Sequence, residues 1–367
     1  MHYSAPPWLP GGHLQTIYPA IGMAKPAVTY RRERWDAPDG DFVDVDFVDG
    51  QPGKPFVVLF HGLEGSSNSH YARALMAHIA ALGWSGAVPH FRGCSGEANH
   101  GPRFYHSGDA QEIDWVVRRL HAQRLHAHCL DAQRLDAQRL DTQRLYAPRG
   151  NTHPARAPGG KFFAVGVSLG GNALLRWLGE FQHQASIVDA VCAVSAPLDL
   201  AAGGAALSRG LNMVYTRMFL RSLRPKCLSK LAQYPDLFDR DTMLRARNLY
   251  EFDNVVTAPL HGYRDTDDYW HRASALHILD DIKVPTLVLN ARNDPFLPER
   301  HLPQRAAAIV TLEYPEEGGH VGFPSGALPG GLDWLPRRIV KFLEGAQMDH
   351  IVCEARMNKV PEGSAHG

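Results

Sequence analysis

Ser168 lies in a Gly-x-Ser-x-Gly sequence that runs from Gly166 to Gly170, directly after the apolar run Phe162–Val167 and directly before a segment with helical periodicity. A serine in such a tight turn between a strand and a helix is held in a strained backbone conformation, and the two glycines leave room for that turn. The N–H groups at the start of the helix point toward any negative charge that develops nearby. A glycine-rich turn whose serine only caps the helix is the alternative. The position between strand and helix favours Ser168 as a nucleophile.

A serine hydroxyl is a poor nucleophile near pH 7 until a base accepts its proton, so a carboxylate and a histidine are needed further along the chain, in that order. Asp294 follows the apolar run Thr286–Asn290, in a turn before a proline, although turns without a catalytic role also favour aspartate there. His320 follows the last apolar run, Ile309–Tyr314, in a glycine-rich loop. Among the chain's 20 histidines, only His320 combines this order with such a loop. We therefore expect His320 to move the proton of Ser168 and Asp294 to orient the imidazole.

The loop at residues 61–67, which follows the first long apolar run, is expected to complete this chemistry. An oxyanion hole needs two backbone N–H groups, one from the residue after the nucleophile and one from such a loop. The two donors expected here are Leu169 and Leu63, and Gly62 allows the backbone a close approach. No phosphate-binding fingerprint, nucleotide motif or pair of metal-binding carboxylates competes in the sequence, so neither a cofactor nor a metal is expected.

Short apolar runs alternate with helical patterns along the chain, and their order indicates how these residues are positioned. Continuous apolar strands separated by helices are typical of a parallel sheet covered on both faces. Residues 27–50 precede them and predict an antiparallel hairpin at one edge. The expected strands are Pro55–Phe60, Gly86–Phe91, Phe162–Val167, Val188–Val194, Thr286–Asn290 and Ile309–Tyr314, and the expected helices are Tyr71–Leu82, Ala110–Leu120, Asn172–Phe181 and Trp334–Leu343.

A pentapeptide repeat between Leu120 and Arg149 interrupts this alternation. Five residues advance an α-helix by about 500°, so the leucines step around the axis by about 140° and never form one apolar stripe. The repeat is rich in helix formers, which leaves both a solvated helical extension and a disordered loop open. In either form we expect a surface insertion over residues 121–160 without a catalytic role. A metal site is disfavoured because later copies lose the histidines, and its candidate ligands would be His121, His126, His128 and Cys129.

A second interruption, residues 198–282, is helical and contains Arg-rich and aromatic stretches. Its place in the chain is where a cap over the C-terminal ends of the strands would shape a substrate pocket, and extra helical packing without substrate contact is the alternative. The predicted organisation is a core in two parts, 1–197 and 283–346, a helical cap at 198–282 and a polar tail at 347–367.

The composition limits the class of protein. With 367 residues, 44% of them hydrophobic, the chain is long enough for one large α/β domain with an insertion. Equal numbers of basic and acidic side chains disfavour nucleic acid and other polyanionic partners. Five scattered cysteines predict neither disulfides nor a zinc site and fit a reducing compartment. The first residues lack the pattern of a signal peptide, and no stretch is apolar enough for a membrane span, so we expect a cytoplasmic protein without integral membrane association.

The motifs together resemble those of the YheT-like branch of the α/β hydrolases, which is akin to the mammalian abhydrolase-domain lipases and phospholipases. The resemblance covers about residues 7–343 and rests, beyond the serine motif, on the sequences Trp8–Thr16, His61–Gly65, His90–Glu97 and Thr257–Gly262. It implies an α/β-hydrolase fold with a mostly parallel central sheet flanked by helices and a helical cap insertion. The family's triad carries over onto Ser168, Asp294 and His320. The chain departs from the family at the pentapeptide repeat, and we expect it to lack the N-terminal membrane anchor of the mammalian relatives.

The resemblance implies hydrolysis of carboxylic esters through an acyl-enzyme intermediate, and we expect a short- to medium-chain carboxylesterase or a lipase-like enzyme acting on a small-molecule ester. The same residues would serve an acyltransferase or a thioesterase. A non-catalytic ligand-binding homologue with an idle triad is the alternative outside enzymes. Serine at the nucleophile position argues against dehalogenase and epoxide hydrolase chemistry, which use an aspartate there.

Overall fold

The computed structural model describes residues 1–143 and 160–357 and contains one eight-stranded sheet, in the order β1-β2-β4-β3-β5-β6-β7-β8. All neighbouring strands from β4 to β8 are parallel, whereas β2 pairs antiparallel with both β1 and β4. The opening hairpin therefore lies at one edge, as the sequence predicts. The strands are β1 (Arg31–Asp36), β2 (Phe42–Val48), β3 (Phe56–Phe60), β4 (Ser85–Pro89), β5 (Phe162–Val167), β6 (Ala190–Val194), β7 (Thr286–Leu289) and β8 (Val310–Glu313).

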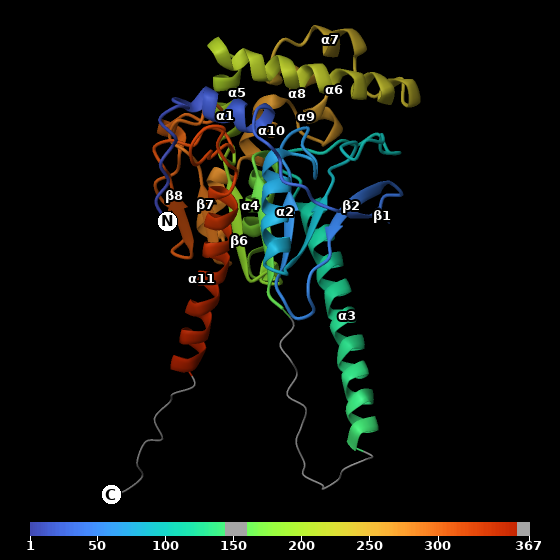
Figure 1. The fold of residues 1–367 in the computed structure, drawn as a ribbon. Coiled ribbons are helices and arrows are strands. Elements are labelled where there is room, and N and C mark those ends of the chain that lie inside the picture. Colours follow the sequence, from blue (N-terminus) through green and yellow to red (C-terminus); the bar gives the residue numbers. More distant parts are fainter. Residues whose placement is uncertain (144–159, 358–367) are drawn as a thin grey trace, which may run out of the picture.

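Helices cover both faces of this sheet, which confirms the predicted α/β-hydrolase architecture (Figure 1). Side chains of the central strands alternate between two apolar clusters, as in β5, where Phe162 and Ala164 face one cluster and Phe163 and Val165 face the other. Burial on both faces explains why the central strands are continuous apolar runs. The first cluster is covered by α3 (Ala110–Gln143) and α4 (Leu169–Phe181), and the second by α2 (His70–Ala81) and α11 (Trp334–Met357).

The carboxylate of Asp46 on β2 is buried and fastens the edge hairpin to loops of the core. It accepts hydrogen bonds from Arg32 at 2.7 Å and from the Ser67 hydroxyl at 2.6 Å, and His90 Nε2 lies 2.9 Å away. Burial alone would raise the pKa of Asp46, but these hydrogen bonds outweigh it and lower that pKa below its usual range. Because Ser67 closes the loop after β3, this network holds one end of the loop expected to supply an oxyanion donor.

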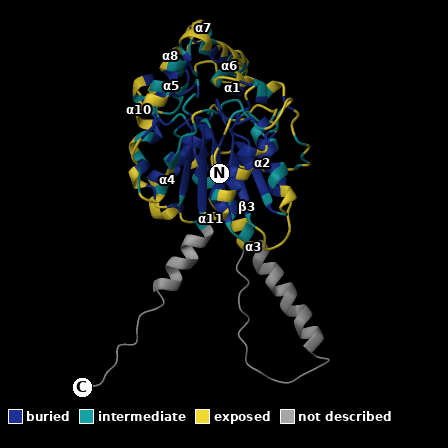
Figure 2. Ribbon diagram, turned by 60° about the vertical axis from the view of Figure 1, so that its left-hand side comes forward, coloured by how far each residue is buried: buried dark blue, intermediate teal, exposed yellow. Residues whose placement is uncertain are grey.

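A group of helices between β6 and β7 lies over the carboxyl ends of the parallel strands (Figure 1). Their outward faces are exposed, whereas the strands below them are buried (Figure 2). Asp199, Asp239, Asn248 and Asp265 cap four of these helices by accepting a backbone N–H bond. The elements are α5 (Leu200–Leu207), η2 (Gly210–Asn212), α6 (Met213–Gln233), α7 (Arg240–Arg245), α8 (Leu249–Val255), α9 (Thr257–Leu260), α10 (Thr266–Ala273) and η3 (Ala275–Asp281).

Two helices run further than their apolar patterns predict. Helix α3 continues through the pentapeptide repeat to Gln143, and the rest of the repeat, residues 144–159, lies outside the described residues. Helix α11 continues past Leu343 to Met357, into the segment predicted as a polar tail. The α3 extension is rich in Ala, Leu, Gln and Arg, and the α11 extension contains Ala, Glu and Met; all of these residues favour a helix even without an apolar stripe. Among the described helices, none is both long and apolar enough to cross a membrane.

A helix that the predicted elements do not include, α1 (Gly12–Ile21), lies at the same end of the molecule as the helices between β6 and β7 (Figure 1). Two further 3-10 segments, η1 (Gln182–Ala185) after α4 and η4 (Glu299–His301) after β7, complete the described elements.

Candidate active site

Ser168 forms the sharp turn between β5 and α4, with a backbone φ of 53° that is rare for any residue except glycine. The flanking glycines are required by close packing. A Cβ on Gly166 would lie 2.5 Å from the carbonyl oxygen of Gly170, and a Cβ on Gly170 would lie 2.4 Å from the carbonyl oxygen of His61. The sequence motif therefore reflects a tightly packed turn that presents the serine side chain at the carboxyl end of β5.

The structure brings Ser168, His320 and Asp294 together. Ser168 and His320 are 152 positions apart in the sequence, and Asp294 and His320 are 26 positions apart. His320 Nε2 lies 2.9 Å from Ser168 Oγ, and His320 Nδ1 lies 2.9 Å from Asp294 Oδ2. The second oxygen of Asp294 accepts the backbone N–H of Phe296 at 2.7 Å, which fixes the carboxylate. Asp294 is 3% exposed and His320 is 9% exposed, so bulk water competes little with either contact. This is the geometry in which a histidine can take a proton from a serine.

The ring of Phe296 stacks on the ring of His320, with centroids 3.9 Å apart and an angle of 12° between the planes. Phe296 also packs against Tyr215 on α6. The imidazole is thus held by an aromatic plane as well as by Asp294. Sequence analysis did not single out Phe296, although its place two residues after the acid was visible.

Helix α1 supports the loops that carry Asp294 and His320. Gln15 Oε1 accepts the side-chain N–H of Asn293 at 2.9 Å and the backbone N–H of Gly318 at 2.9 Å. The hydroxyl of Thr16 accepts the backbone N–H of His320 at 2.8 Å. Gln15 is completely buried. Both polar side chains lie within the sequence Trp8–Thr16 that carried part of the family resemblance, but nothing in that sequence indicated what they contact.

The backbone N–H groups of Leu63 and Leu169 have no hydrogen-bond partner among the described residues. Their neighbours are occupied, since Gly62 N–H donates to the hydroxyl of Tyr71 at 2.9 Å and Glu64 N–H donates to that of Tyr105 at 2.7 Å. A Cβ on Gly62 would lie 3.0 Å from Ser168 Cβ, so this loop passes directly beside Ser168. The two expected oxyanion donors are therefore available to a bound oxygen.

The imidazole of His61 stabilises this loop by hydrogen bonds to the backbone. Its Nδ1 lies 2.8 Å from the carbonyl oxygen of Gly62, and its Nε2 accepts the backbone N–H of Phe91 at 3.0 Å. Burial lowers the pKa of His61 to about 3, so the ring is neutral near pH 7 and donates from Nδ1. His61 thus has a structural role, which the motif alone did not distinguish from a catalytic one.

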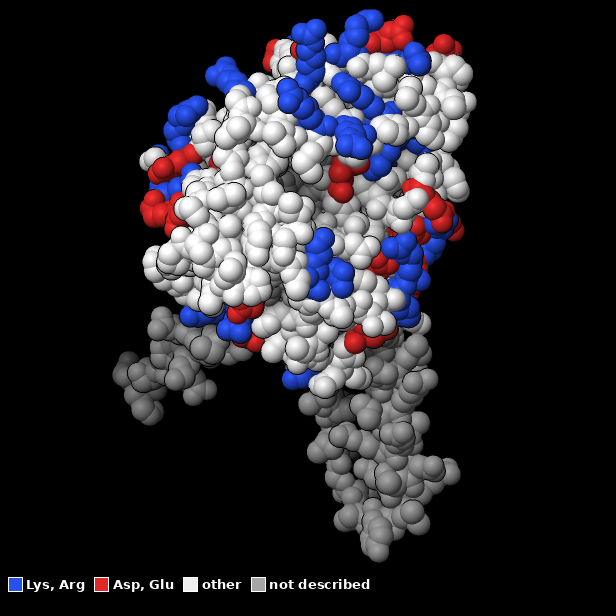
Figure 3. Space-filling model, turned by 45° about the horizontal axis from the view of Figure 1, so that its top comes forward, with Lys and Arg blue, Asp and Glu red and all other residues white. Residues whose placement is uncertain are grey.

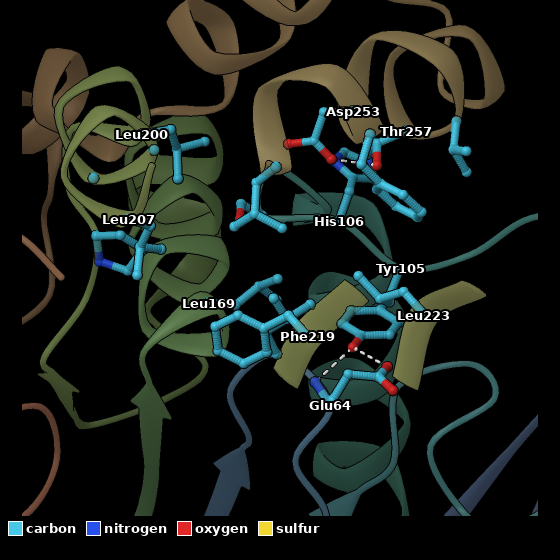
Figure 4. A pocket seen from close by; sticks show the side chains of 18 of the residues that line it. Glu64, Tyr105, His106, Leu169, Leu200, Leu207, Phe219, Leu223, Asp253 and Thr257 are labelled. Carbon is cyan, nitrogen blue, oxygen red and sulfur yellow. Dashed lines mark hydrogen bonds between the residues drawn. The ribbon is translucent and has the colours of Figure 1, made fainter. Parts of the chain in front are cut away.

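A largely apolar pocket adjoins Ser168 beneath the helices between β6 and β7. Its cavity volume is about 130 Å³. Its walls come from both the core and these helices. Residues that line it include Leu169, Leu200, Leu207, Phe219, Leu223 and Phe252 (Figure 4). An elongated apolar group fits such a lining better than a highly charged one.

Two polar groups lie at opposite sides of the pocket (Figure 4). On one side, Glu64 accepts a hydrogen bond from Tyr105 at 2.9 Å and forms an ion pair with Lys226 of α6 at 2.7 Å. On the other side, Asp253 accepts hydrogen bonds from Thr257 at 2.6 Å and from Trp270 at 2.8 Å. Burial raises the pKa of Asp253 to about 6. Glu64 and Thr257 lie in sequences that carried the family resemblance, but no pattern in the chain indicated that these or the other polar residues face the pocket.

Within the described residues, no group of three or more His, Cys, Asp and Glu side chains is arranged to hold a metal ion. Of the repeat's candidate ligands, His128 and Cys129 fall where no side chain is described, and His121 stacks on Phe162 instead. Neither a metal nor a cofactor enters the chemistry derived from this site.

Comparison with known proteins shows which family has sequences similar to this chain. The profile of the alpha/beta hydrolase family matches residues 57–328. The chain is 37% identical to the Escherichia coli (strain K12) protein named "Putative esterase YheT" over 338 residues, which cover 90% of this chain and 89% of that one. It is 27% identical to Phospholipase ABHD3 of Mus musculus over 92% of this chain and 76% of that one. It is 26% identical to Monoacylglycerol lipase of Saccharomyces cerevisiae over 86% of this chain and 63% of that one.

The chain belongs to the alpha/beta hydrolase family. Within that family it is a YheT-like protein related to the ABHD3 phospholipases, which confirms the resemblance found in the sequence motifs. It is thus related to proteins named for hydrolysis of esters and lipids.

Proposed function

We propose that this protein is a serine esterase that cleaves carboxylic esters through an acyl-enzyme intermediate, with Ser168, His320 and Asp294 as its catalytic triad. The observation that carries the proposal is the continuous chain of contacts from Ser168 Oγ to His320 Nε2 and from His320 Nδ1 to Asp294, each 2.9 Å long. The relatives named as an esterase, a phospholipase and a monoacylglycerol lipase support the same reaction class.

In the first half of the reaction, Ser168 Oγ attacks the carbonyl carbon of the ester while His320 Nε2 accepts the hydroxyl proton. Asp294 accepts the N–H of His320 Nδ1, which holds the correct tautomer and stabilises the imidazolium. The N–H groups of Leu63 and Leu169 bind the oxyanion. Collapse of the tetrahedral intermediate breaks the bond to the alcohol, which leaves with the proton from His320.

In the second half, His320 removes a proton from a water molecule, and the resulting hydroxide attacks the acyl carbon. The carbon–oxygen bond to Ser168 breaks, and the serine recovers its proton from His320. The net reaction adds one water to one ester and yields one acid and one alcohol. Each proton removed by His320 is returned, so no other acid or base is needed.

The apolar pocket supports an acyl chain of short to medium length as the part of the substrate that binds beside Ser168. Residues 198–282 act in this proposal as a cap, since α5, α6 and α8 supply much of the lining. The alcohol of the ester is bound nearer the opening. A series of p-nitrophenyl esters of increasing chain length tests this assignment, and we expect kcat/KM to rise to a maximum at short to medium chains. A flat profile, or one that falls from acetate onward, would contradict it.

A fluorophosphonate probe tests the catalytic proposal directly, because it reacts only with an activated serine. We expect stoichiometric labelling of the wild-type protein and none of Ser168→Ala. His320→Ala should lower both labelling and turnover by about 10⁴-fold or more. His183→Ala, which replaces an exposed histidine in η1 without a role in the site, serves as the matched control and should behave as wild type. Folded wild-type protein that remains unlabelled would refute the proposal.

A further inference from the structure

Helix α1 has its apolar and polar residues on unexpected sides. Its buried positions are Gln15, Thr16 and Pro19, which face the loops of the site. Its outward face carries three aliphatic side chains at helical spacing: Leu14, Ile17 and Ile21, which are 49%, 36% and 77% exposed. These side chains add nothing to the core, and the residues that the structure describes leave this apolar face of α1 exposed.

Helix α6 presents a second exposed face of the same kind. Its inner side lines the pocket through Phe219 and Leu223. Its outer side mixes apolar and cationic residues one helical turn apart, and just before the helix Leu211 is 72% exposed. The exposed residues of this outer side include Val214, Arg217, Met218 and Arg221.

The two helices are in contact, because His13 of α1 stacks on Tyr215 of α6 with 9° between the rings, and His13 Nδ1 lies 3.1 Å from the Tyr215 hydroxyl. Both helices lie at the end of the molecule beyond the carboxyl ends of the strands (Figure 1). We call their exposed residues the α1–α6 surface: Leu14, Ile17, Ile21, Leu211, Val214, Arg217, Met218 and Arg221.

The charge on this surface is one-sided, although the whole chain is neutral. Helix α6 contains no acidic residue; its three arginines lie outside the pocket, whereas Lys226 pairs with Glu64 and Lys230 is buried. In the part of the chain that the structure describes, Arg217 and Arg221 form no ion pair. A shallow groove along the outer side of α6 adds Arg224 and Arg247 to them. Lys and Arg side chains gather over this upper end of the molecule (Figure 3).

We propose that the α1–α6 surface docks on a lipid bilayer that contains anionic lipids. Exposed aliphatic side chains interleaved with arginines match both parts of such a partner, because the aliphatic groups enter the boundary of the acyl chains while the guanidinium groups pair with lipid phosphates. An acidic protein or a nucleic acid would match the arginines but would leave Leu14, Ile17 and Ile21 in water. The proposal goes beyond ester hydrolysis, since docking places the pocket on the inner side of α6 next to the bilayer whatever reaction follows.

Sedimentation with vesicles tests the docking separately from catalysis, because binding is measured with Ser168→Ala protein. We expect binding to vesicles of phosphatidylcholine with 30 mol% phosphatidylglycerol, about the anionic content needed for polybasic surfaces, and at least tenfold weaker binding to pure phosphatidylcholine. Arg217→Gln/Arg221→Gln should weaken binding to the anionic vesicles by about 30-fold, since each cationic side chain near the surface contributes about fivefold. Ile21→Ser/Met218→Ser should weaken the binding that persists in 0.5 M NaCl, about the ionic strength at which charge attraction is largely screened.

The matched control is Lys54→Gln/Lys283→Gln, which removes two exposed cations just before the amino ends of β3 and β7, at the opposite end of the sheet. It should bind the anionic vesicles as the unaltered protein does. Fluorophosphonate labelling of the same substitutions with Ser168 intact checks that each variant is folded. Equal binding to both kinds of vesicle, equal loss in the control, or retention on polyglutamate or DNA without vesicle binding would each overturn the proposal.

Discussion

Gln15→Leu tests whether α1 positions the loops that carry Asp294 and His320 or only stabilises the fold. The side-chain amide of Gln15 donates to the carbonyl oxygen of Leu9 at 3.0 Å and to Glu317 at 3.1 Å, and its oxygen accepts from Asn293 and Gly318, both at 2.9 Å. Leucine has a similar volume but no polar atom. The substitution therefore removes four hydrogen bonds without leaving a large cavity.

The expected effect follows from the two donors that lose their acceptor. A buried N–H group without a partner costs about 1 to 3 kcal/mol, so the unrelaxed loops would be destabilised by about 2 to 6 kcal/mol. The loops can recover part of this by turning Asn293 and Gly318 toward water. Asn293 precedes Asp294, and Gly318 lies two residues before His320, so this movement misaligns the triad. A displacement of about 1 Å lowers the rate of the chemical step by about 10²-fold.

The assay is steady-state hydrolysis of a p-nitrophenyl ester together with the rate of fluorophosphonate labelling. We expect kcat and the labelling rate to fall together by about 10²-fold, and KM to change by less than about threefold. Phe163→Leu is the control, because Phe163 is buried in β5 and its truncation lowers stability without contacting either loop. It should lower the melting temperature but leave kcat unchanged. If Gln15→Leu loses stability as the control does and keeps its kcat, the positioning role of α1 is refuted.

Further predictions concern the pocket and the serine turn. Because the raised pKa of about 6 means that folded Asp253 holds its proton more tightly than the unfolded chain does, the contribution of Asp253 to stability falls as pH rises from about 4 to about 6. Asp253→Asn should remove this fall. Its free energy of unfolding in urea, relative to that of wild type, should therefore rise by up to about 3 kcal/mol across that pH range. A difference between the two proteins that stays constant with pH would contradict the raised pKa of Asp253. Lys226→Met should lower kcat by about tenfold, because it leaves the carboxylate of Glu64 without a counter-charge next to the proposed oxyanion loop. Adding Glu64→Gln should restore kcat, and a double variant no faster than the single one would exclude this electrostatic cause. Gly170→Ala should yield little soluble protein, because its Cβ would lie 2.4 Å from the carbonyl oxygen of His61, and normal expression would show that the turn can relax.

The sheet was predictable because burial on both faces leaves an unambiguous pattern. Strand β5 begins and ends at the predicted residues, Phe162 and Val167. Errors arise where an apolar residue serves another purpose. Phe91 was assigned to a strand, but β4 ends at Pro89 and Phe91 packs against His61 instead. Helix α4 begins at Leu169 rather than Asn172, because the glycines of its first turn are required by packing and conceal its start.

Helix α1 was not predictable by periodicity, and the reason is physical. The usual rule assigns apolar residues to the buried face of a helix. In α1 the buried residues include Gln15 and Thr16, while Ile17 and Ile21 are exposed. The order and spacing of the proposed triad could be inferred from the chain alone, because each member follows a strand. The contacts that hold the triad could not, since they come from a segment about 300 positions away whose pattern is inverted.

The bond between Gln15 and Gly318 also governs when the site can form during synthesis. These two residues are 303 positions apart. At typical rates of translation, about 5 to 20 residues per second, Gly318 is made about 15 to 60 s after Gln15. Until then the buried amide of Gln15 has no loop to organise, and the nascent chain lacks His320 altogether. A ribosome-bound chain that already contains Ser168 would therefore carry an unactivated serine, and reactivity toward fluorophosphonates would appear only near the end of synthesis.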